Sequence, residues 1–274
     1  KGRFSGKTSE IGSYDIRAVA TNAAGETSRA FTLNGADTQI FVFRNRTPAE
    51  LAESLDSLRQ LITGAQILAF AGGFSAGDEP DGSGKFIANV IRERRIADAI
   101  MALLTERDGL VLGICNGFQA LIKTGLVPYG EIRGPSAEMP TLTFNTIGHH
   151  VSRMVRTELA STMSPWAAGL DAGKDYLVPV SHGEGRVIAS DTLAVELFAK
   201  GQVATQYADF AGNVSMDDEW NVNGSYNAIE GITSEDGRVF GKMAHAERRG
   251  DNVARNIYGR QHLRIFESGV QYFK

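Results

Sequence analysis

Three short, almost continuously apolar runs limit the folds open to this chain more than any other feature of the sequence. They span Gln39–Phe43, Gln66–Ala71 and Gly109–Ile114, and stretches of helical length separate them. Runs of strand length that are apolar at successive positions are typical of strands buried on both faces of a parallel sheet. Together with Tyr14–Ala20, which is expected to form a further strand, they predict an α/β fold with helices on both faces of a mostly parallel sheet.

The helices expected between these strands have recognisable ends. Thr47-Pro48-Ala49-Glu50 is a capping box with proline at the first helical position, and Gly64 is expected to end that helix. One long helix is predicted over Lys85–Leu104. Another apolar helix follows Cys115 and is expected to close at Gly125.

The second half of the chain, from about Met139, has a different pattern. Short alternating segments are separated by glycine and aspartate, and Asp236-Gly237 is a hairpin signal between Ile229–Thr233 and Arg238–Ala244. Antiparallel strands are therefore expected to extend the sheet. Asp191–Lys200 is the one convincing helix predicted in this half.

Composition favours a protein that acts on a small molecule. The net charge of -4 comes without a basic block or a long acidic run, which argues against nucleic acid and an anionic membrane as partners. The sequence lacks a run of about 20 apolar residues and an apolar signal core, so a cytoplasmic protein is expected. Lys1–Ser13 is polar and rich in glycine and serine and is interpreted as a linker before one domain over residues 14–274. This start favours a fragment of a longer fused chain.

The chain contains one cysteine, which excludes disulfides within the chain and cysteine-rich zinc sites. This residue, Cys115, lies in Gly113-Ile114-Cys115-Asn116-Gly117, where a buried strand is expected to turn sharply into a helix. The glycines permit the strained turn, and a helix N-terminus favours the thiolate over the thiol. A buried structural cysteine is the alternative, because free cysteine packs as a small hydrophobe. The elbow pattern favours a reactive nucleophile.

A thiolate nucleophile also needs a base, a group that orients the base and donors for an oxyanion. The pattern His-x-Glu occurs at His182-Gly183-Glu184 and again at His245-Ala246-Glu247. In either motif the carboxylate could orient the imidazole, and spacing leaves the choice open, as it does the alternative of hydrogen-bonded histidines without a catalytic role. Gly72-Gly73 follows a central strand and offers backbone N–H groups for the oxyanion.

Two further motifs are not interpreted as sites. Gly82-Ser83-Gly84-Lys85 resembles a phosphate loop, but Glu79 occupies the first glycine position and Phe86 replaces the Ser/Thr that would meet magnesium. His149-His150 has no carboxylate or cysteine at ligand spacing, so no metal site is predicted.

Five motifs are similar to those of a known family: Gly72–Ser75, Gly77–Phe86, Gly113–Gln119, Ser181–Arg186 and His245–Arg248. With them the sequence resembles the class I glutamine amidotransferases, and among these the glutaminase domain of phosphoribosylformylglycinamidine synthases, from about Tyr14 to the C-terminus. The elbow is shared by a broad superfamily, whereas the second and fourth motifs are specific to the purine enzymes. The resemblance implies a flavodoxin-like sheet, mostly parallel with an antiparallel extension.

The resemblance also implies residue roles. Cys115 corresponds to the nucleophile, His245 to its base and Glu247 to the residue that orients the base. The oxyanion or the substrate is expected to meet Gly72, Gly73, Phe74, Asn116 and Phe118. Residues expected to line or shape the glutamine pocket are Gln119, Ser181, His182, Glu184 and Arg186. Ala244 and Ala246 depart from the family, which more often has proline, glycine or serine beside the histidine, and only small geometric effects are expected.

The activity implied by the resemblance is hydrolysis of glutamine to glutamate and ammonia. The ammonia would serve conversion of formylglycinamide ribonucleotide to its amidine in a synthetase domain or subunit outside this chain. ATP and magnesium are expected there, and no cofactor is expected in this chain. Two alternatives remain open: a stand-alone γ-glutamyl hydrolase or peptidase of the same fold, and a catalytically silent regulatory module.

Overall fold

The centre of the protein is a set of parallel strands. The structure is a computed structural model that describes residues 3–4, 15–20, 36–73, 82–250 and 253–274. The predicted strands are present, and they lie side by side in parallel in the order β3 (Asp37–Val42), β2 (Asp15–Ala20), β4 (Ile67–Phe70), β5 (Leu110–Ile114) and β12 (Val239–Lys242). Every residue of β4, β5 and β12 is buried, as expected for strands covered on both faces.

Antiparallel strands extend this sheet beyond β12. They follow in the order β11 (Ile229–Thr233), β10 (Val203–Ala208), β7 (Val151–Leu159) and β8 (Asp175–His182), and β1 (Arg3–Phe4) pairs antiparallel with β3 at the other edge. β6 (Thr141–Phe144) and β9 (Glu184–Ile188) form a separate antiparallel pair. The predicted fold class, a parallel sheet with an antiparallel extension, is confirmed. Apart from Arg3 and Phe4, the segment interpreted as a linker lies outside the described residues.

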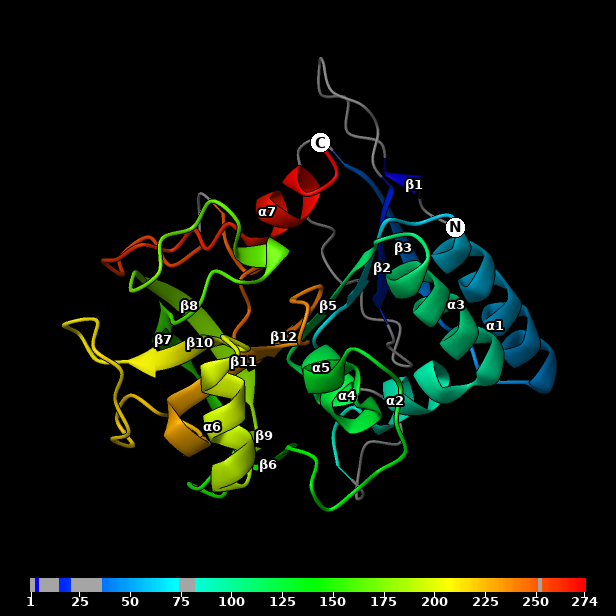
Figure 1. Ribbon diagram of the computed structural model, residues 1–274. Coiled ribbons are helices and arrows are strands. Elements are labelled where there is room, and N and C mark those ends of the chain that lie inside the picture. The colour runs from blue at the N-terminus through cyan, green and yellow to red at the C-terminus, as the bar shows by residue number, and fades with distance from the viewer. Residues whose placement is uncertain (1–2, 5–14, 21–35, 74–81, 251–252) are drawn as a thin grey trace.

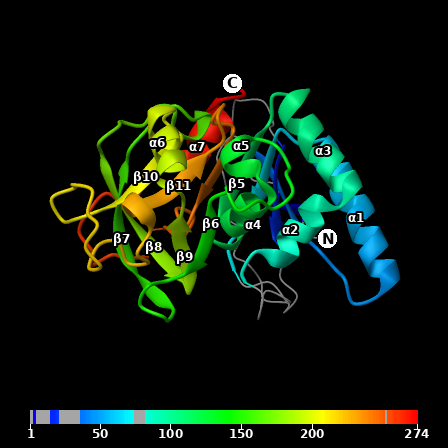
Figure 2. The ribbon, with the colours of Figure 1, turned by 60° about the horizontal axis from the view of Figure 1, so that its bottom comes forward.

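Helices lie at both ends of this arrangement. α1 and α3 pack together beside the N-terminal strands, α6 lies at the opposite end near β10 and β11, and α7 is close to the C-terminus (Figure 1). Seen from below, the parallel strands lie between α4 and α5 on one side and α1 and α3 on the other (Figure 2). The bounds are α1 (Pro48–Thr63), α2 (Lys85–Arg92), α3 (Arg94–Thr105), α4 (Asn116–Thr124), α5 (Leu126–Tyr129), α6 (Asp191–Ala199) and α7 (Ile265–Gln271), with 3-10 turns η1 (Pro165–Ala167) and η2 (Tyr226–Ala228).

Two helix predictions are confirmed at their ends. The Thr47 hydroxyl accepts a hydrogen bond from the Glu50 N–H at 3.1 Å, as a helix N-cap does, and the Gly64 N–H donates to the last turn of α1. The Glu50 carboxylate reaches one residue further back than in a standard capping box and accepts from the Arg46 N–H at 3.1 Å. Gly125 ends α4 with a φ of 83°, a conformation that glycine adopts without strain.

The prediction of one helix over Lys85–Leu104 is wrong, because the chain breaks into α2 and α3 at Glu93. Glu93 has extended backbone angles, φ -59° and ψ 127°, and its carboxylate caps α3 by accepting from the Ile96 N–H at 3.2 Å. A side chain that satisfies a free N–H of a new helix makes such a break possible without glycine or proline. α7, in the C-terminal half, was not predicted at all.

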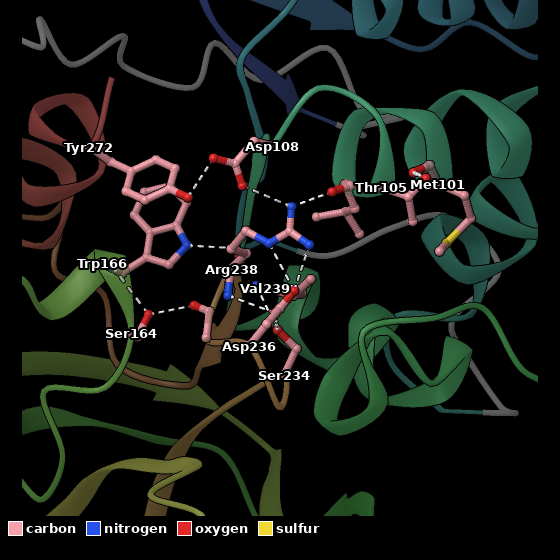
Figure 3. A network of polar contacts seen from close by, with 12 residues as sticks. Met101, Thr105, Asp108, Ser164, Trp166, Ser234, Asp236, Arg238, Val239 and Tyr272 are labelled. Carbon is pink, nitrogen blue, oxygen red and sulfur yellow. Dashed lines mark hydrogen bonds and ion pairs between the residues drawn. The ribbon is translucent and has the colours of Figure 1, made fainter. Parts of the chain in front are cut away.

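The predicted Asp236-Gly237 turn joins β11 to β12 and is fastened to the rest of the protein through Arg238. Its guanidinium donates to the Leu104 carbonyl, to the Asp108 carboxylate at 3.2 Å and to the Asp236 carboxylate at 2.7 and 2.8 Å (Figure 3). Arg238 directly precedes β12, and Asp108 precedes β5 by two residues. These contacts therefore align the starts of two adjacent parallel strands.

The same group of residues anchors the C-terminal helix. The Tyr272 hydroxyl donates to the Asp108 carboxylate at 2.8 Å, and the indole N–H of Trp166 donates to the Arg238 carbonyl at 3.0 Å (Figure 3). Since β5 and β12 are parallel, residues that follow both strands emerge together at the opposite edge of the sheet.

Within the described residues, no helix is long and apolar enough to cross a membrane.

Candidate active site

Cys115 lies at a strained corner between β5 and α4. Its φ of 53° and ψ of -106° are unusual for a residue with a side chain, and its N–H donates to the Lys242 carbonyl on β12 at 2.8 Å. The neighbouring glycines are required by close packing. A Cβ on Gly117 would lie 2.2 Å from the Phe70 carbonyl oxygen, and one on Gly113 would lie 2.6 Å from Leu121. The elbow predicted from the sequence is therefore present.

His245 follows β12 by three residues and is almost completely buried. Its Nδ1 lies 2.5 Å from the Glu247 carboxylate, and its backbone N–H donates to the Pro179 carbonyl on β8 at 2.8 Å. Nδ1 is thus occupied, and Nε2 has no hydrogen-bond partner within normal distance among the described residues. Nε2 is the ring nitrogen left for Cys115.

Gly72 is the point at which the thiol-bearing and imidazole-bearing segments meet. A Cβ on this glycine would lie 2.6 Å from Cε1 of His245 and 3.1 Å from Cβ of Cys115. Both side chains therefore lie against the same backbone position at the end of β4. The absence of a side chain at residue 72 is what allows the imidazole and the cysteine to approach each other there.

The environment of His245 favours its protonated form. Burial lowers the pKa of the imidazole, but the interactions of the ring with Cys115 and with the Glu247 carboxylate outweigh burial and raise the pKa to about 9. The His245 imidazole is therefore protonated over the neutral pH range.

The glycine segment after β4 is connected to the helix that follows Cys115. The Asn116 side-chain amide donates to the Gly73 carbonyl at 2.7 Å, and Gly73 has a φ of 129°. The first N–H groups of α4 have no partner within the helix, so those of Asn116 and Phe118 lie among the donors that a helix N-terminus offers. The Phe118 ring packs on Gly241 in the core, where a Cβ would lie 2.1 Å from it. Phe74 lies outside the described residues, as does the first half of the Gly77–Phe86 motif, residues 77–81.

A pocket with about 350 Å³ of empty space, part of it open to solvent, lies over the cysteine. Its lining joins segments from five parts of the chain: Gly73, Ser83, Cys115, Gln119, Ser181, His182, Gly183 and Arg248. Gly73, Cys115, Gln119, Ser181 and His182 were predicted site residues. Ser83, Gly183 and Arg248 were missed, although each lies within a motif that carried the family resemblance. Membership of those motifs was the signal that could have identified them.

The end of β8 forms one wall of this pocket. The Ser181 carbonyl lies 3.8 Å from the Cys115 sulfur, and the Ser181 hydroxyl lies 3.0 Å from Nε2 of His150. His182 is 2% exposed, and neither of its ring nitrogens has a hydrogen-bond partner among the described residues. Burial, followed by the positive charges of His245 and His150, lowers the pKa of His182 to about 4. His182 is therefore a neutral imidazole at neutral pH.

Glu184 and Gln119 connect the wall of the pocket to neighbouring segments. The Glu184 carboxylate accepts from the Ser83 N–H at 2.9 Å and does not bond to the His182 ring, while its carbonyl accepts from the Gln119 side-chain amide. Arg186 lies apart from the pocket lining and donates through Nε to the Gly224 carbonyl at 3.2 Å. Of the predicted pocket residues, Glu184 and Arg186 are thus absent from the pocket lining and instead bond to neighbouring segments.

The site has the donor groups of a proton-transfer centre. In the part of the chain that the structure describes, no cluster of three or more His, Cys, Asp or Glu side chains is arranged to hold a metal ion. The described residues around Cys115 offer a thiol, an imidazole paired with a carboxylate and the backbone N–H groups of a helix N-terminus. This set can perform nucleophilic attack on a carbonyl carbon with acid–base assistance.

A parallel sheet that carries a cysteine elbow places the chain among the α/β proteins with a nucleophile at a strand-to-helix corner, and comparison with known proteins assigns it to the glutamine amidotransferases. Within this class, a family model described as a CobB/CobQ-like glutamine amidotransferase domain matches residues 16–273, and the chain belongs to that family.

Proteins similar to this chain extend over nearly all of it. A phosphoribosylformylglycinamidine synthase subunit PurQ from Dehalococcoides mccartyi is 35% identical over 267 residues, which are 96% of this chain and 92% of that protein. The subunit PurQ from Methanococcus maripaludis is 30% identical over 277 residues, and the match covers 92% of this chain and 93% of that protein. Among solved structures, PurLQS from Thermotoga maritima contains a chain with 26% sequence identity and a TM-score of 0.64, with 94% of this chain and 99% of that chain covered.

Proposed function

We propose that this protein is the glutaminase component of a phosphoribosylformylglycinamidine synthase, and that it hydrolyses glutamine through Cys115, His245 and Glu247. The family and the relatives support the reaction class and the synthase. The observation that carries the residue assignment is the contact at Gly72, where the imidazole and the cysteine lie against one backbone position. Nucleophile and base come from segments about 130 residues apart in the sequence.

The geometry favours the second His-x-Glu motif as the catalytic one. Glu247 bonds to His245 and leaves Nε2 for the thiol, whereas Glu184 bonds to the Ser83 N–H and leaves the His182 ring without a partner. A carboxylate that fixes the tautomer and orientation of an imidazole is the arrangement that general-base catalysis requires. His182 is accordingly assigned to the glutamine pocket.

In the first half of the reaction, the Cys115 thiolate attacks the carbonyl carbon of the glutamine side-chain amide. The C=O bond becomes a C–O⁻ bond, and N–H groups near Gly73 and at the start of α4, those of Asn116 and Phe118, donate to this oxyanion. The C–N bond then breaks, His245 gives its proton to the leaving nitrogen, and ammonia departs. A γ-glutamyl thioester remains on Cys115.

In the second half, His245 accepts a proton from water, and the resulting hydroxide attacks the thioester carbon. The C–S bond breaks, glutamate leaves and the thiolate with its imidazolium is restored, so one glutamine and one water give one glutamate and one ammonia. Every step uses groups of this chain alone. ATP and magnesium are assigned to the synthetase component, which receives the ammonia.

The test uses the full chain together with the synthetase component of the same organism. Cys115→Ala should abolish glutamine-dependent formation of the amidine, while added ammonium salt should still support it. Wild-type chain treated with a chloroketone analogue of glutamine should gain one adduct that peptide mapping places on Cys115. A Cys115→Ala complex that retains glutamine-dependent turnover, or that loses the ammonia-dependent rate as well, would contradict the assignment.

The same measurements separate the remaining activities. Efficient hydrolysis of γ-glutamyl peptides by the chain alone, with no effect of the synthetase component, would replace the proposal with a peptidase. Absence of an adduct on Cys115 in the assembled complex would replace it with a silent module.

A further inference from the structure

We propose that the buried ion pair of Glu230 and Lys242 is a positioning device for the reaction, because it fixes the backbone of Ala244 and through it places His245 beside Cys115. The inference rests on the proposed function, since it concerns the same nucleophile and base. Neither charged residue lies in the pocket lining, and neither belongs to the motifs that pointed to the site.

The pair is completely buried. Both side chains have 0% exposure, and the Lys242 ammonium lies 3.1 Å from the Glu230 carboxylate. The second carboxylate oxygen of Glu230 accepts from the Thr205 hydroxyl on β10. Glu230 on β11 is thus held by the lysine of one neighbouring strand, β12, and by Thr205 of the other, β10. Both of its carboxylate oxygens have donors.

Both charged groups also bond to the backbone of one residue, Ala244. The Glu230 carboxylate accepts from the Ala244 N–H at 2.5 Å, and the Lys242 ammonium donates to the Ala244 carbonyl at 2.8 Å. Ala244 immediately precedes His245. The peptide groups on both sides of residue 244 are therefore held by one pair of side chains.

Ala244 needs these partners because the chain leaves the sheet there. β12 ends at Lys242, and residues 243–245 belong to no helix or strand. Buried N–H and C=O groups outside regular structure must find other partners. The Met243 N–H donates to the Glu230 carbonyl at 3.2 Å, and the His245 N–H donates to the Pro179 carbonyl at 2.8 Å. The ion pair supplies the partners for the residue between them.

The same lysine is connected to the nucleophile through its backbone. The Lys242 carbonyl accepts from the Cys115 N–H at 2.8 Å, and Lys242 pairs with Ile114 in the register of β12 and β5. One residue therefore contacts the elbow through its main chain and the segment bearing the base through its side chain. A shift of this residue would change the separation of sulfur and imidazole directly.

Stability alone does not require such a pair. Removing two charges from water is unfavourable, and apolar residues of similar size at buried ion pairs often leave stability unchanged or improve it. What an apolar pair cannot supply is an acceptor and a donor aimed at one peptide segment. Catalysis is sensitive to this kind of placement, because a misplacement of about 1 Å can reduce a rate on the order of 100-fold.

The experiment compares Lys242→Met, Glu230→Gln and the double variant E230Q/K242M in the full chain with its synthetase component. Lys242→Met leaves a buried carboxylate unpaired and is expected to lower the thermal midpoint as well as activity. The double variant has no unpaired charge, and the Gln carbonyl can still accept from the Ala244 N–H, but the donor to the Ala244 carbonyl is gone. Its thermal midpoint should return toward the wild-type value.

For the double variant we expect a glutamine-dependent kcat about 10- to 100-fold below wild type. The KM for glutamine should change little, and the ammonia-dependent rate should be unchanged. Alkylation of Cys115 by the chloroketone analogue should require higher pH, because the imidazolium has moved away from the sulfur. Lys200→Met, which removes a lysine from an exposed ion pair with Glu235, is the matched control and should behave as wild type.

The inference would be overturned if the double variant kept the wild-type thermal midpoint, kcat and pH profile of alkylation. The ion pair would then have no role in positioning His245. A KM effect without a kcat effect would overturn it as well. Failure of the proposed function is distinguishable, since in that case the wild-type chain itself would give no adduct on Cys115.

Discussion

Replacing His182 with phenylalanine should remove a large loss of stability that the native protein suffers in mild acid. The imidazole is 2% exposed, and its ring nitrogens have no hydrogen-bond partner among the described residues. Its ring packs against Gly185, where a Cβ would lie 2.6 Å from ring atoms. Phenylalanine keeps a flat ring against this glycine and cannot take up a proton.

The magnitude follows from the pKa of His182, which burial and the charges of His245 and His150 lower from 6.5 to about 4. Below pH 6.5 the unfolded chain binds a proton at this residue, while the folded protein does not until about pH 4. Folding stability therefore falls as the pH falls through this window, by about 1.4 kcal/mol per unit and about 3 kcal/mol in all. The side chain is nearly inaccessible to solvent, so screening does not reduce this figure appreciably.

The assay is urea unfolding of wild type and His182→Phe at pH values from 4 to 7.5, followed by circular dichroism. The difference in unfolding free energy between the two proteins should shift by about 3 kcal/mol in favour of the variant between pH 6.5 and 4. His149→Phe, the same substitution at an exposed histidine, should keep the wild-type dependence on pH. A His182→Phe variant whose stability falls with pH as steeply as wild type would refute the reasoning.

Three further substitutions test other contacts. Gly72→Ala places a Cβ 2.6 Å from the His245 ring and 3.1 Å from Cys115 Cβ, so glutaminase turnover should fall on the order of 100-fold with little change in the melting temperature. Glu247→Gln puts an amide against Nδ1 of His245 and disturbs the tautomer, so kcat should fall about 10³-fold. The variant should still bind the chloroketone analogue of glutamine when this compound is present at a saturating concentration. Arg238→Met removes the bonds that align β5 with β12 and should destabilise the fold by about 2 kcal/mol, measured by urea unfolding, with KM for glutamine unchanged.

Much of the local structure could be predicted from the sequence because adjacent residues determine it. The Cys115 corner needs small neighbours on both sides, and the Asp236-Gly237 turn needs glycine at a positive φ, which is 74°. The break at Glu93 could not be predicted, because an ordinary helix-forming residue serves there as a cap. α7 was missed for a related reason: Gly269 disfavours a helix locally, but its bare backbone packs on the Trp166 ring, where a Cβ would lie 2.4 Å away.

The residues of the site could be predicted from the sequence, but it was harder to predict which carboxylate bonds to which imidazole. Spacing treats the two His-x-Glu motifs alike, and only the folded structure shows that the Glu184 carboxylate bonds to the Ser83 N–H while that of Glu247 bonds to His245. Lys242 gave no signal at all, since a lysine in a strand ordinarily points to solvent. Its burial depends on Glu230, a contact between strands that sequence periodicity does not encode.

The two buried histidines of the site have opposite electrostatic environments, because His245 interacts with Cys115 and with the Glu247 carboxylate, whereas His182 has no such partner. His245 holds its proton up to about pH 9, whereas His182 stays neutral down to about pH 4. The second result depends in part on the first, because the charge of His245 is one of the causes that lower the pKa of His182. At neutral pH His245 is therefore the imidazolium of this pair, and His182 is the neutral imidazole. In the proposed reaction this places the transferable proton on the ring beside the sulfur and leaves the second ring as a neutral hydrogen-bonding group for the substrate.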